Sequence, residues 1–455
     1  MHRRVVVTGI GVVCAIGQSV SEFWNNCLQG NTVVSNIPNH WFTYSKYKSH
    51  IWSTLPEIDF SEYDISRVDL LQYDMVSLLS LCVGKQAIDS SGYTIINKNN
   101  KNKTFEIKGL DPHRTGIYMG TGSFGAHGFL ETHAFQILSN PKTNLNSLFN
   151  KLTNSECERE EAQSILDSLV HPRRYNPFAV SRLMPNAISA VLGIKYSIKG
   201  PTNTVALACA AGTSAIGQAY RAIKNGYIDI AITGGSEYWD DYYGGIFRGF
   251  DIANTLVQNC TDPSAANCPF DENRTGFLFS QGGSAALVLE DLEIAKQRNA
   301  NILAEIVGFS ESFDAYSMMS IEPSGTEIEH MILNTLKDAD ITPKQIDYIN
   351  AHGTGTVAND FVECKVLCRI FGSKPKVNST KSLLGHTIGA SGALEAVVTI
   401  LSLQDQKTHV CKNLNNPISS LNFVYEVERN NFEYALSHSF AFGGHNAGLA
   451  IKRFR

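Results

Sequence analysis

Residues 205–217 read Val-Ala-Leu-Ala-Cys-Ala-Ala-Gly-Thr-Ser-Ala-Ile-Gly, and they decide the fold class. An apolar strand is expected to end at Cys209, where the residues become small. Apolar residues then recur at helical spacing between Ile216 and Ile223, and Gly226 ends that pattern. Because a second apolar stretch follows at once, the pattern predicts a β-α-β unit with a thiol at the N-terminus of its helix.

This position gives Cys209 a chemical interpretation. Unpaired amides and the helix dipole favour the thiolate at a helix N-terminus, so we expect a lowered pKa and a nucleophilic sulfur. The same amides can hold an oxyanion. The alternative is that Cys209 is one small buried hydrophobe among ten cysteines. Position alone leaves the two interpretations equally good.

The same alternation of short strands and helical patterns runs along the chain, which predicts a layered α/β fold. A strand that leads into Gly-Thr-Gly occurs twice, and so does a strand that leads into Gly-Gly, in the same order in both halves. This repetition indicates a duplication with its boundary near residues 291–301. Strands are expected at 4–7, 117–119, 205–208, 228–233, 302–307, 347–351 and 449–452.

Composition narrows the functional classes. The chain has 455 residues, of which 43% are hydrophobic and 18% charged, so disorder along the whole chain is excluded. A net charge of −5 gives no general reason to expect nucleic-acid binding. No apolar run is long enough to span a membrane. The ten cysteines show no disulfide pattern, so we expect reduced thiols and a cytoplasmic location.

Two histidines and a lysine lie in glycine-rich transitions between strands and helices. His352 follows an apolar strand and precedes Gly-Thr-Gly-Thr, and His386 follows Lys381 by five residues. A helix expected over about 390–403 is apolar nearly all round, so it should be buried. A lone histidine in such a place is more often a core residue. Three such groups together favour an active site, because α/β proteins assemble their sites at these transitions.

A fourth segment is Phe442 with the adjacent Gly443 and Gly444. Neighbouring glycines let a backbone approach another group closely. The alternative is a tight turn before the last strand.

These segments together resemble the β-ketoacyl-[acyl-carrier-protein] synthases, the condensing enzymes of the thiolase fold. The motifs are Ala-Cys-Ala-Ala-Gly at Cys209, Asn-Ala-His-Gly-Thr-Gly-Thr at His352, Lys-Ser-Leu-Leu-Gly-His-Thr up to His386, and Phe-Gly-Gly-His-Asn from Phe442. The resemblance covers almost the whole chain. It implies a duplicated five-layer α-β-α-β-α fold with halves at 1–291 and 292–455, and the Cys-His-His set is similar to the elongating branch.

The resemblance implies a decarboxylative Claisen condensation. Cys209 would take an acyl chain from a thioester, with the amides of Cys209 and Phe442 as oxyanion hole and Gly443 and Gly444 as part of the gate. His352 and His386 would hold the oxygen of malonyl-acyl-carrier protein while it loses carbon dioxide, which yields a 3-oxoacyl-carrier protein. Lys381 would order the charges around His352, supported by Asp360, Glu363 and Glu395.

No metal and no other cofactor is implied, because the substrates ride on the 4′-phosphopantetheine of an acyl carrier protein. Arg173 and Arg174 resemble the family's docking segment for this acidic partner, the alternative being two ordinary surface arginines. Asn254 stands where the family often has a further arginine, and 66–69 is less basic than usual. The carrier would then be a dedicated one, or a partner subunit would share the docking.

The acyl pocket is assigned by the same resemblance to Ser123, Phe124, Phe250 and Met319. Ala441 replaces a usual glycine before the gate, which favours specialised polyketide or polyene chains over ordinary fatty-acid elongation. The enzyme would be a homodimer, or a heterodimer with a homologous, catalytically silent chain-length subunit. In the second interpretation it acts mainly together with that partner.

Two other site types fit the sequence less well. Residues 120–125 match a dinucleotide-binding fingerprint, but no second strand that ends in an acidic residue follows at the required distance. The cysteines include no Cys-x-x-Cys pair, so a zinc site is not expected.

Overall fold

The computed structural model describes residues 2–99, 104–122, 177–258, 260 and 262–455. Within these residues, eleven strands form one mixed sheet, in the order β13-β12-β11-β14-β15-β10-β1-β9-β8-β6-β7. The strands are β1 (Val5–Val13), β6 (Thr115–Gly120), β7 (Thr202–Val205), β8 (Ile230–Tyr238), β9 (Gly282–Asp291), β10 (Ala304–Phe313), β11 (Tyr348–Asn350), β12 (Lys376–Asn378), β13 (Asn422–Phe423), β14 (Tyr434–Phe440) and β15 (His445–Arg453).

The sheet repeats one pattern on each side of its centre, where β1 pairs antiparallel with β10. In the first half β6 lies parallel to β7 and β8, and β8 pairs antiparallel with β9. In the second half β11 lies parallel to β12 and β14, and β14 pairs antiparallel with β15. The duplicated α/β fold expected from the sequence is therefore confirmed.

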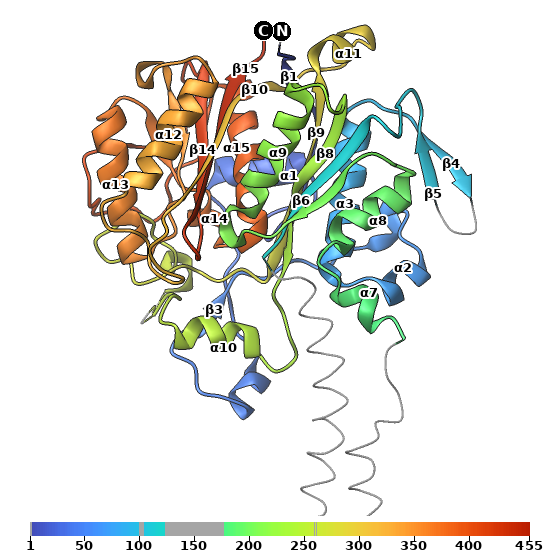
Figure 1. Cartoon of the computed structure of the whole chain (residues 1–455). Helices are drawn as coiled ribbons and strands as arrows, with labels where there is room; N and C mark the ends of the chain where they lie inside the picture. Colours follow the sequence, from blue (N-terminus) through green and yellow to red (C-terminus); the bar gives the residue numbers. More distant parts are fainter. Residues whose placement is uncertain (1, 100–103, 123–176, 259, 261) are drawn as a thin grey trace, which may run out of the picture.

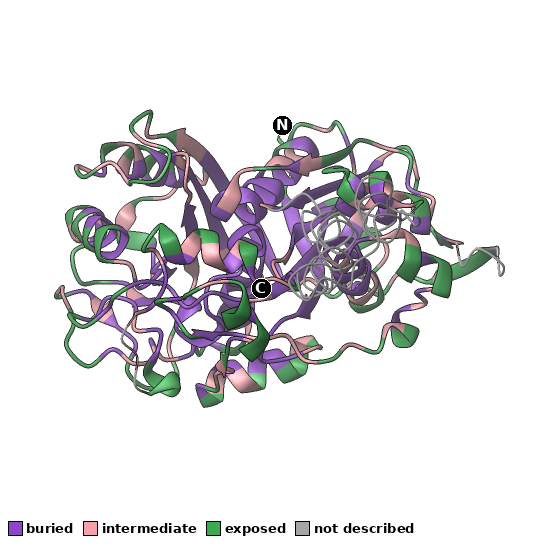
Figure 2. Ribbon diagram, turned by 90° about the horizontal axis from the view of Figure 1, so that it is seen from below, coloured by how far each residue is buried: buried purple, intermediate pink, exposed green. Residues whose placement is uncertain are grey.

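The two halves of the sheet are two layers, and helices outside each half and between the halves are the other three (Figure 1). Helices α3 (Met75–Ser90) and α8 (Ala187–Tyr196) cover the outer face of the first half, and α12 (Thr326–Asp338) and α13 (Val357–Phe371) cover that of the second. Helices α9 (Ala211–Lys224) and α15 (Ser391–Asp405) lie between the halves. All residues of α15 from 391 to 403 are buried, as its apolar sequence predicts. Figure 2 shows the buried residues concentrated along the sheet and these central helices.

Glycines let the two central helices touch backbone to backbone. A Cβ atom on Gly212 of α9 would lie 2.9 Å from the amide nitrogen of Ala393 on α15. A Cβ atom on Gly392 of α15 would lie 2.8 Å from the amide nitrogen of Thr213 on α9. The N-terminal ends of both helices are thereby brought together, and these ends carry the residues described below.

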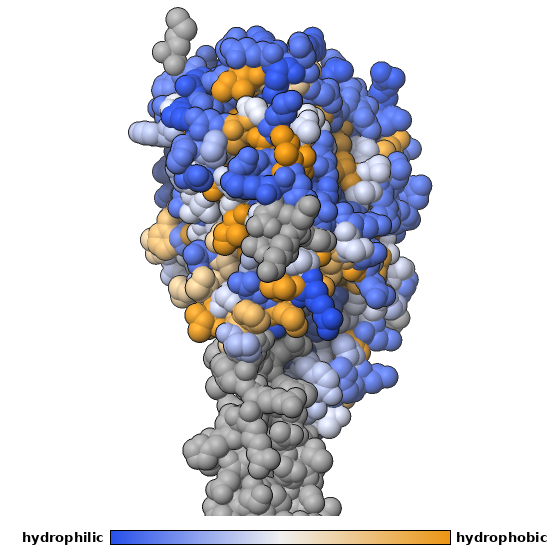
Figure 3. All heavy atoms as spheres, turned by 90° about the vertical axis from the view of Figure 1, so that its right-hand side faces the viewer, coloured by the Kyte–Doolittle hydropathy of each residue, from blue (hydrophilic) through white to orange (hydrophobic). Residues whose placement is uncertain are grey.

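The remaining elements lie around this core. The lower part of the face in Figure 3 carries apolar side chains. Helices α2 (Arg67–Gln72) and α7 (Ala179–Leu183) expose Val68, Leu71 and Val180. No helix of the described residues is both long and apolar enough to cross a membrane. These elements are α1 (Val20–Gln29), α2 (Arg67–Gln72), α7 (Ala179–Leu183), α10 (Gly245–Ile252), α11 (Leu292–Gln297), α14 (Lys381–Leu384), β2 (Ser35–Asn36), β3 (Ile51–Trp52), β4 (Ile95–Asn99) and β5 (Thr104–Ile107).

Candidate active site

Cys209 lies in a strained turn between β7 and α9. The strand expected over 205–208 ends already at Val205, because residues Ala208–Ala210 form a 3₁₀ turn, η4. Ala208 has a φ of 44°, a left-handed conformation that side chains other than glycine rarely adopt. The turn points the thiol into the interior, where Cys209 is only 3% exposed.

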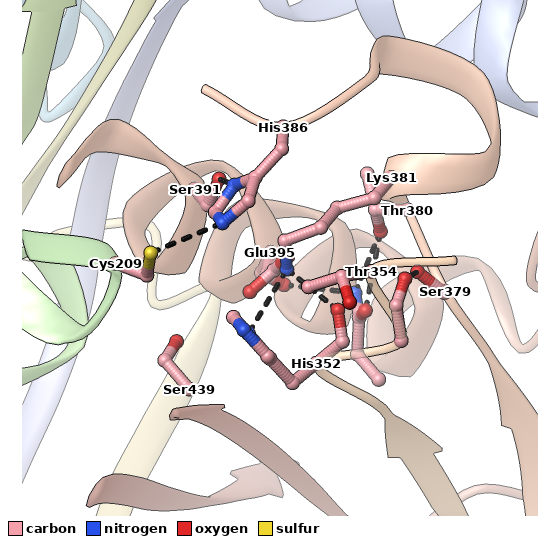
Figure 4. A network of polar contacts seen from close by, with 12 residues as sticks. Cys209, His352, Thr354, Ser379, Thr380, Lys381, His386, Ser391, Glu395 and Ser439 are labelled. Carbon is pink, nitrogen blue, oxygen red and sulfur yellow. Dashed lines mark hydrogen bonds and ion pairs between the residues drawn. The ribbon is translucent and has the colours of Figure 1, made fainter. Parts of the chain in front are cut away.

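His386 approaches Cys209 from the second half of the molecule. It precedes a matching 3₁₀ turn, η7 (Ile388–Ala390), which leads into α15, and Ile388 has a φ of 48°. The Nε2 atom of His386 lies 3.1 Å from the Sγ atom of Cys209 (Figure 4). Two residues 177 positions apart are thus brought into hydrogen-bond contact.

Local contacts decide which nitrogen of His386 carries the proton. The backbone N–H of Ile388 donates to Nδ1 across 3.2 Å, so Nδ1 is an acceptor and the neutral ring has its hydrogen on Nε2. Burial, with the charge of Lys381 second, lowers the pKa of His386 well below 6.5. His386 therefore presents an uncharged Nε2–H to the cavity.

His352 reaches the same state through Lys381. The Lys381 ammonium lies 3.2 Å from Nδ1 of His352, donates to the His352 carbonyl at 2.7 Å, and forms a buried ion pair with Glu395 (Figure 4). An ammonium can only donate, so Nδ1 accepts and Nε2 carries the hydrogen. Burial and then Lys381 lower the pKa of His352 well below 6.5. Its ring lies nearly perpendicular to that of His386, with centroids 5.6 Å apart.

Buried carboxylates hold the turn that follows His352. Glu363 accepts the backbone N–H groups of His352 and Gly353 at 2.7 and 2.8 Å. Asp360 accepts those of Thr354 and Phe270 at 3.1 and 2.8 Å. Burial raises the pKa of Asp360 to about 6 and that of Glu395 to about 7.

The Phe442 loop closes the site beside the sulfur. The backbone N–H of Phe442 donates to the thiol of Cys209. Gly443 and Gly444 have φ values of 88° and 83°, a conformation that requires glycine, and the Gly443 N–H donates to the carbonyl of Met318 at 2.8 Å. The two glycines thus turn the chain so that the Phe442 amide faces Cys209.

The pKa expected for Cys209 is wrong. Burial raises it to about 12, although Lys381 and the Phe442 amide both act in the opposite direction. A helix N-terminus stabilises a thiolate, but removal from water costs more when the sulfur is nearly inaccessible.

These groups line one cavity of about 340 Å³, with Cys209, His352, His386 and Phe442 in its wall. Met319 also lines it, but is 53% exposed and so lies near the opening. Phe250 is not among the lining residues, because its ring packs on Phe277 and Phe279 at 5.9 and 5.3 Å.

Comparison with known proteins identifies the family of the chain. The family models for the N-terminal and C-terminal domains of beta-ketoacyl synthase match residues 2–295 and 303–415. The chain belongs to the beta-ketoacyl synthase family. It is 32% identical to a 3-oxoacyl-[acyl-carrier-protein] synthase 2 of Synechocystis sp., over 100% of this chain and 99% of that protein. It is also 32% identical to the Coxiella burnetii protein of that name, over 99% of both.

Solved structures agree with this family. The type II polyketide complex AntDE:AntF, an acyl-carrier protein with its ketosynthase, matches with a TM-score of 0.82 and 26% identity over 100% of both chains. The ishigamide ketosynthase/chain length factor matches with a TM-score of 0.80 and 26% identity, also over 100% of both.

Several predicted positions of this synthase cannot be compared with the structure. Ser123, Phe124, Arg173 and Arg174 lie outside the described residues. Asn254, in contrast, is described: it lines the cavity and accepts a hydrogen bond from Lys48.

Sequence reasoning missed three residues that touch the site. Ser391 contacts Nδ1 of His386 at 3.0 Å, and His438 donates to Glu363 at 2.7 Å. Glu237, at the end of β8, is fully buried and accepts the amides of Gly122 and Gly389 at 2.7 and 2.9 Å. A charged residue that follows a Gly-Gly pair on an apolar strand was a usable signal for Glu237. Nothing in the spacing marks the other two.

Proposed function

We propose that this protein condenses an acyl chain held on Cys209 with malonyl-acyl-carrier protein, to give a 3-oxoacyl-carrier protein and carbon dioxide. One observation carries the proposal: a thiol, two neutral imidazoles and the residue whose backbone amide faces the thiol, from four distant segments, line one cavity. The names of the bacterial relatives, which are 3-oxoacyl-[acyl-carrier-protein] synthases, support the same reaction.

The first step transfers the acyl group. The Cys209 sulfur bonds to the thioester carbon, the carbon–sulfur bond to the carrier breaks, and the thiol proton leaves with the carrier thiol. Because Nε2 of His386 already carries a hydrogen, this ring does not act as the base. The backbone amides of Cys209 and Phe442 stabilise the oxyanion, and the charge of Lys381 favours the developing thiolate.

The second step uses the two histidines as donors. Their Nε2–H groups hold the carbonyl oxygen of the malonyl thioester while the bond to the carboxylate breaks and carbon dioxide leaves. The enolate carbon then bonds to the acyl carbon, the bond from that carbon to the Cys209 sulfur breaks, and the Cys209 thiolate takes a proton from solvent. Neutral imidazoles suit this role, because each Nε2–H group stabilises the negative charge that develops on the oxygen and keeps its own proton.

Replacement of Cys209 tests the assignment. Cys209→Ala should abolish transfer of an acyl group to the protein, measured as an added mass on the intact chain, and leave the thermal midpoint nearly unchanged. Cys209→Gln should still release carbon dioxide from malonyl-carrier protein, because both histidine donors remain. Cys260→Ala, at a half-buried cysteine, serves as the matched control. Acyl transfer by Cys209→Ala at the wild-type rate would exclude this nucleophile.

A second candidate is the ketosynthase subunit of a heterodimer. The ishigamide structure pairs a ketosynthase with a chain length factor, and Ala441 beside the gate fits a specialised chain. Co-purification with a homologous subunit and mass spectrometry of carrier-bound products test this. A homodimer that makes only saturated chains would favour fatty-acid elongation instead.

We further propose that Arg173 and Arg174 dock the carrier and that the enzyme works in the cytoplasm. The nine described cysteines are all unpaired, which supports a reducing compartment. Glutamate at both arginines should raise the KM for carrier-bound substrates and spare small thioester mimics. Equal losses on both substrates would reject the docking role.

A further inference from the structure

A third histidine is buried behind the site. Side chains alternate along β14, so Leu436, His438 and Phe440 share one face, and both Leu436 and Phe440 belong to the apolar core that packs against α13. His438 interrupts this apolar row, although it is completely inaccessible to solvent. The reaction described above makes no use of it.

Only one nitrogen of His438 has a partner. Its Nε2 lies 2.7 Å from Oε1 of Glu363, whereas its Nδ1 is buried without any hydrogen-bond partner among the described residues. A phenylalanine would fill the same space and bury no unpaired nitrogen. The imidazole is therefore explained by its single hydrogen bond and not by packing.

That hydrogen bond ends on the carboxylate that holds His352. Oε1 of Glu363 also accepts the His352 amide at 2.7 Å, and Oε2 accepts the Gly353 amide at 2.8 Å. The Asn359 side chain adds a weaker contact at 3.3 Å. Without His438, the only hydrogen bond left to Oε1 of Glu363 would be the one from the His352 amide, the group that Glu363 holds in place.

An aromatic contact joins the same residues by a second route. The ring of His438 stacks on Phe440 with centroids 5.0 Å apart and an angle of 16°. Phe440 in turn contacts the ring of His352 at 5.4 Å and lines the cavity. His438 thus supports both the backbone and the ring of His352, and no described contact joins it to Cys209 or His386.

We propose that His438 is a positioning residue for His352: it orients the Glu363 carboxylate, which anchors the backbone from which the His352 donor reaches the substrate oxygen. The inference rests on the proposed function, because it assigns His438 to decarboxylation and condensation and not to acyl transfer. A misplaced donor weakens only the step in which it stabilises charge.

The two partial reactions separate this role from a structural one. His438→Phe keeps the stack on Phe440 but removes the donor. In the Cys209→Gln background it should lower release of carbon dioxide from malonyl-carrier protein on the order of 10–100-fold. With Cys209 present, the rate of acyl transfer from an acyl-carrier substrate to Cys209, measured as added mass on the intact chain, should stay within about twofold of wild type. His438→Gln, whose amide reaches about as far as Nε2, should restore most of the decarboxylation.

Further variants guard against misfolding. His438→Asn is smaller, and its amide stops short of Glu363, so it should show the same selective loss if the phenylalanine does not fit. Tyr220→Phe is the matched control, because it deletes a buried hydroxyl that contacts the Val307 carbonyl, Asp338 and Lys224, all outside the cavity wall, and it should change neither partial reaction. Full decarboxylation by folded His438→Phe or His438→Asn, or equal loss of both partial reactions, overturns the inference. A Cys209→Gln parent that released no carbon dioxide would instead refute the proposed function, and the inference with it.

Discussion

The two imidazoles of the candidate site, His352 and His386, owe their protonation state to the groups that contact their Nδ1 atoms. A backbone amide donates to Nδ1 of His386, and a lysine ammonium donates to Nδ1 of His352. Neither of these groups can accept a hydrogen bond, so Nδ1 is the acceptor in both rings and Nε2 carries the hydrogen. Burial then keeps them uncharged. The site therefore supplies two hydrogen-bond donors without the cost of burying two cations.

We expect His352 and His386 to stay neutral as the pH falls from 8 to 6, because their pKa values lie well below 6.5. Spectra of protein with ¹⁵N-labelled histidine should show Nε2–H signals for both that do not move over this range. His352→Asn and His386→Asn assign the signals. A titration midpoint near the ordinary value of about 6.5 for either ring would contradict the assigned state.

The convergence of Cys209, His352 and His386 on one cavity could be predicted from the sequence, but their electrostatics could not. Cys209, His352 and His386 each stand where a strand meets a helix beside glycines, and this is a local signal. The pKa of Cys209 depends on how many segments cover the sulfur, and those segments come from distant parts of the chain. His438 was missed for the same reason, because only the fold places it against Glu363.

At the scale of elements, the candidate active site is formed by two equivalent turns. The 3₁₀ turns η4 and η7 precede the two central helices, each strained at one residue with positive φ, Ala208 or Ile388. The helices approach at Gly212 and Gly392, so the distance from Cys209 to His386 depends on a contact between backbones.

This dependence predicts opposite effects for two helical glycines. Gly212→Ala should gain roughly 1 kcal/mol of helix propensity but lose about 1–3 kcal/mol by forcing α9 from α15, and it should slow acyl transfer. Gly193→Ala on α8 meets no atom closer than 3.5 Å, so it should be neutral or stabilising by up to about 1 kcal/mol. Urea denaturation and acylation rates measure both. A Gly212→Ala protein that is as stable and as active as wild type would show that α9 and α15 can move apart without cost, which would contradict this prediction.

Elements were predictable where apolar runs end at glycines. Six of the seven expected strands are present with shifted ends, whereas the strand expected over 205–208 overlaps β7 (Thr202–Val205) only at Val205. Strand β9 (Gly282–Asp291) was missed because it begins Gly-Gly-Ser-Ala-Ala, which has little intrinsic preference for a strand. It forms because β1 and β8 pair with it on both sides, so tertiary context overrides its local sequence.

At the scale of the whole molecule, the two halves share one sheet. The antiparallel pairing of β1 with β10 runs directly across the proposed division at residues 291 and 292. The cavity draws Cys209 from one half and both histidines from the other. The division into 1–291 and 292–455 stays a prediction, but this arrangement means that neither half contains a complete site.

The stability of the whole fold should depend on His409, which lies on the segment after α15, is completely buried and accepts a hydrogen bond from Asn378 of β12 at its carbonyl. Its Nδ1 donates to the Val410 carbonyl at 2.8 Å, and its Nε2 lies 3.1 Å from the Thr380 hydroxyl. Burial lowers its pKa to about 4. Below pH 6.5, His409 therefore binds a proton in the unfolded chain, whereas in the folded protein it binds one only below about pH 4.

The free energy of unfolding should consequently fall as the pH drops from 6.5 to 4, and the His409 contribution to this fall is on the order of 3 kcal/mol. His409→Gln removes the titrating group, so its stability should decline less steeply than that of wild type. Urea denaturation at pH 8, 6 and 4.5 separates this slope from any constant cost of the substitution, which is already present at pH 8. Other buried carboxylates titrate in both proteins alike and cancel in the difference. Parallel curves for the two proteins would mean that His409 gains its proton in the fold as easily as in the unfolded chain.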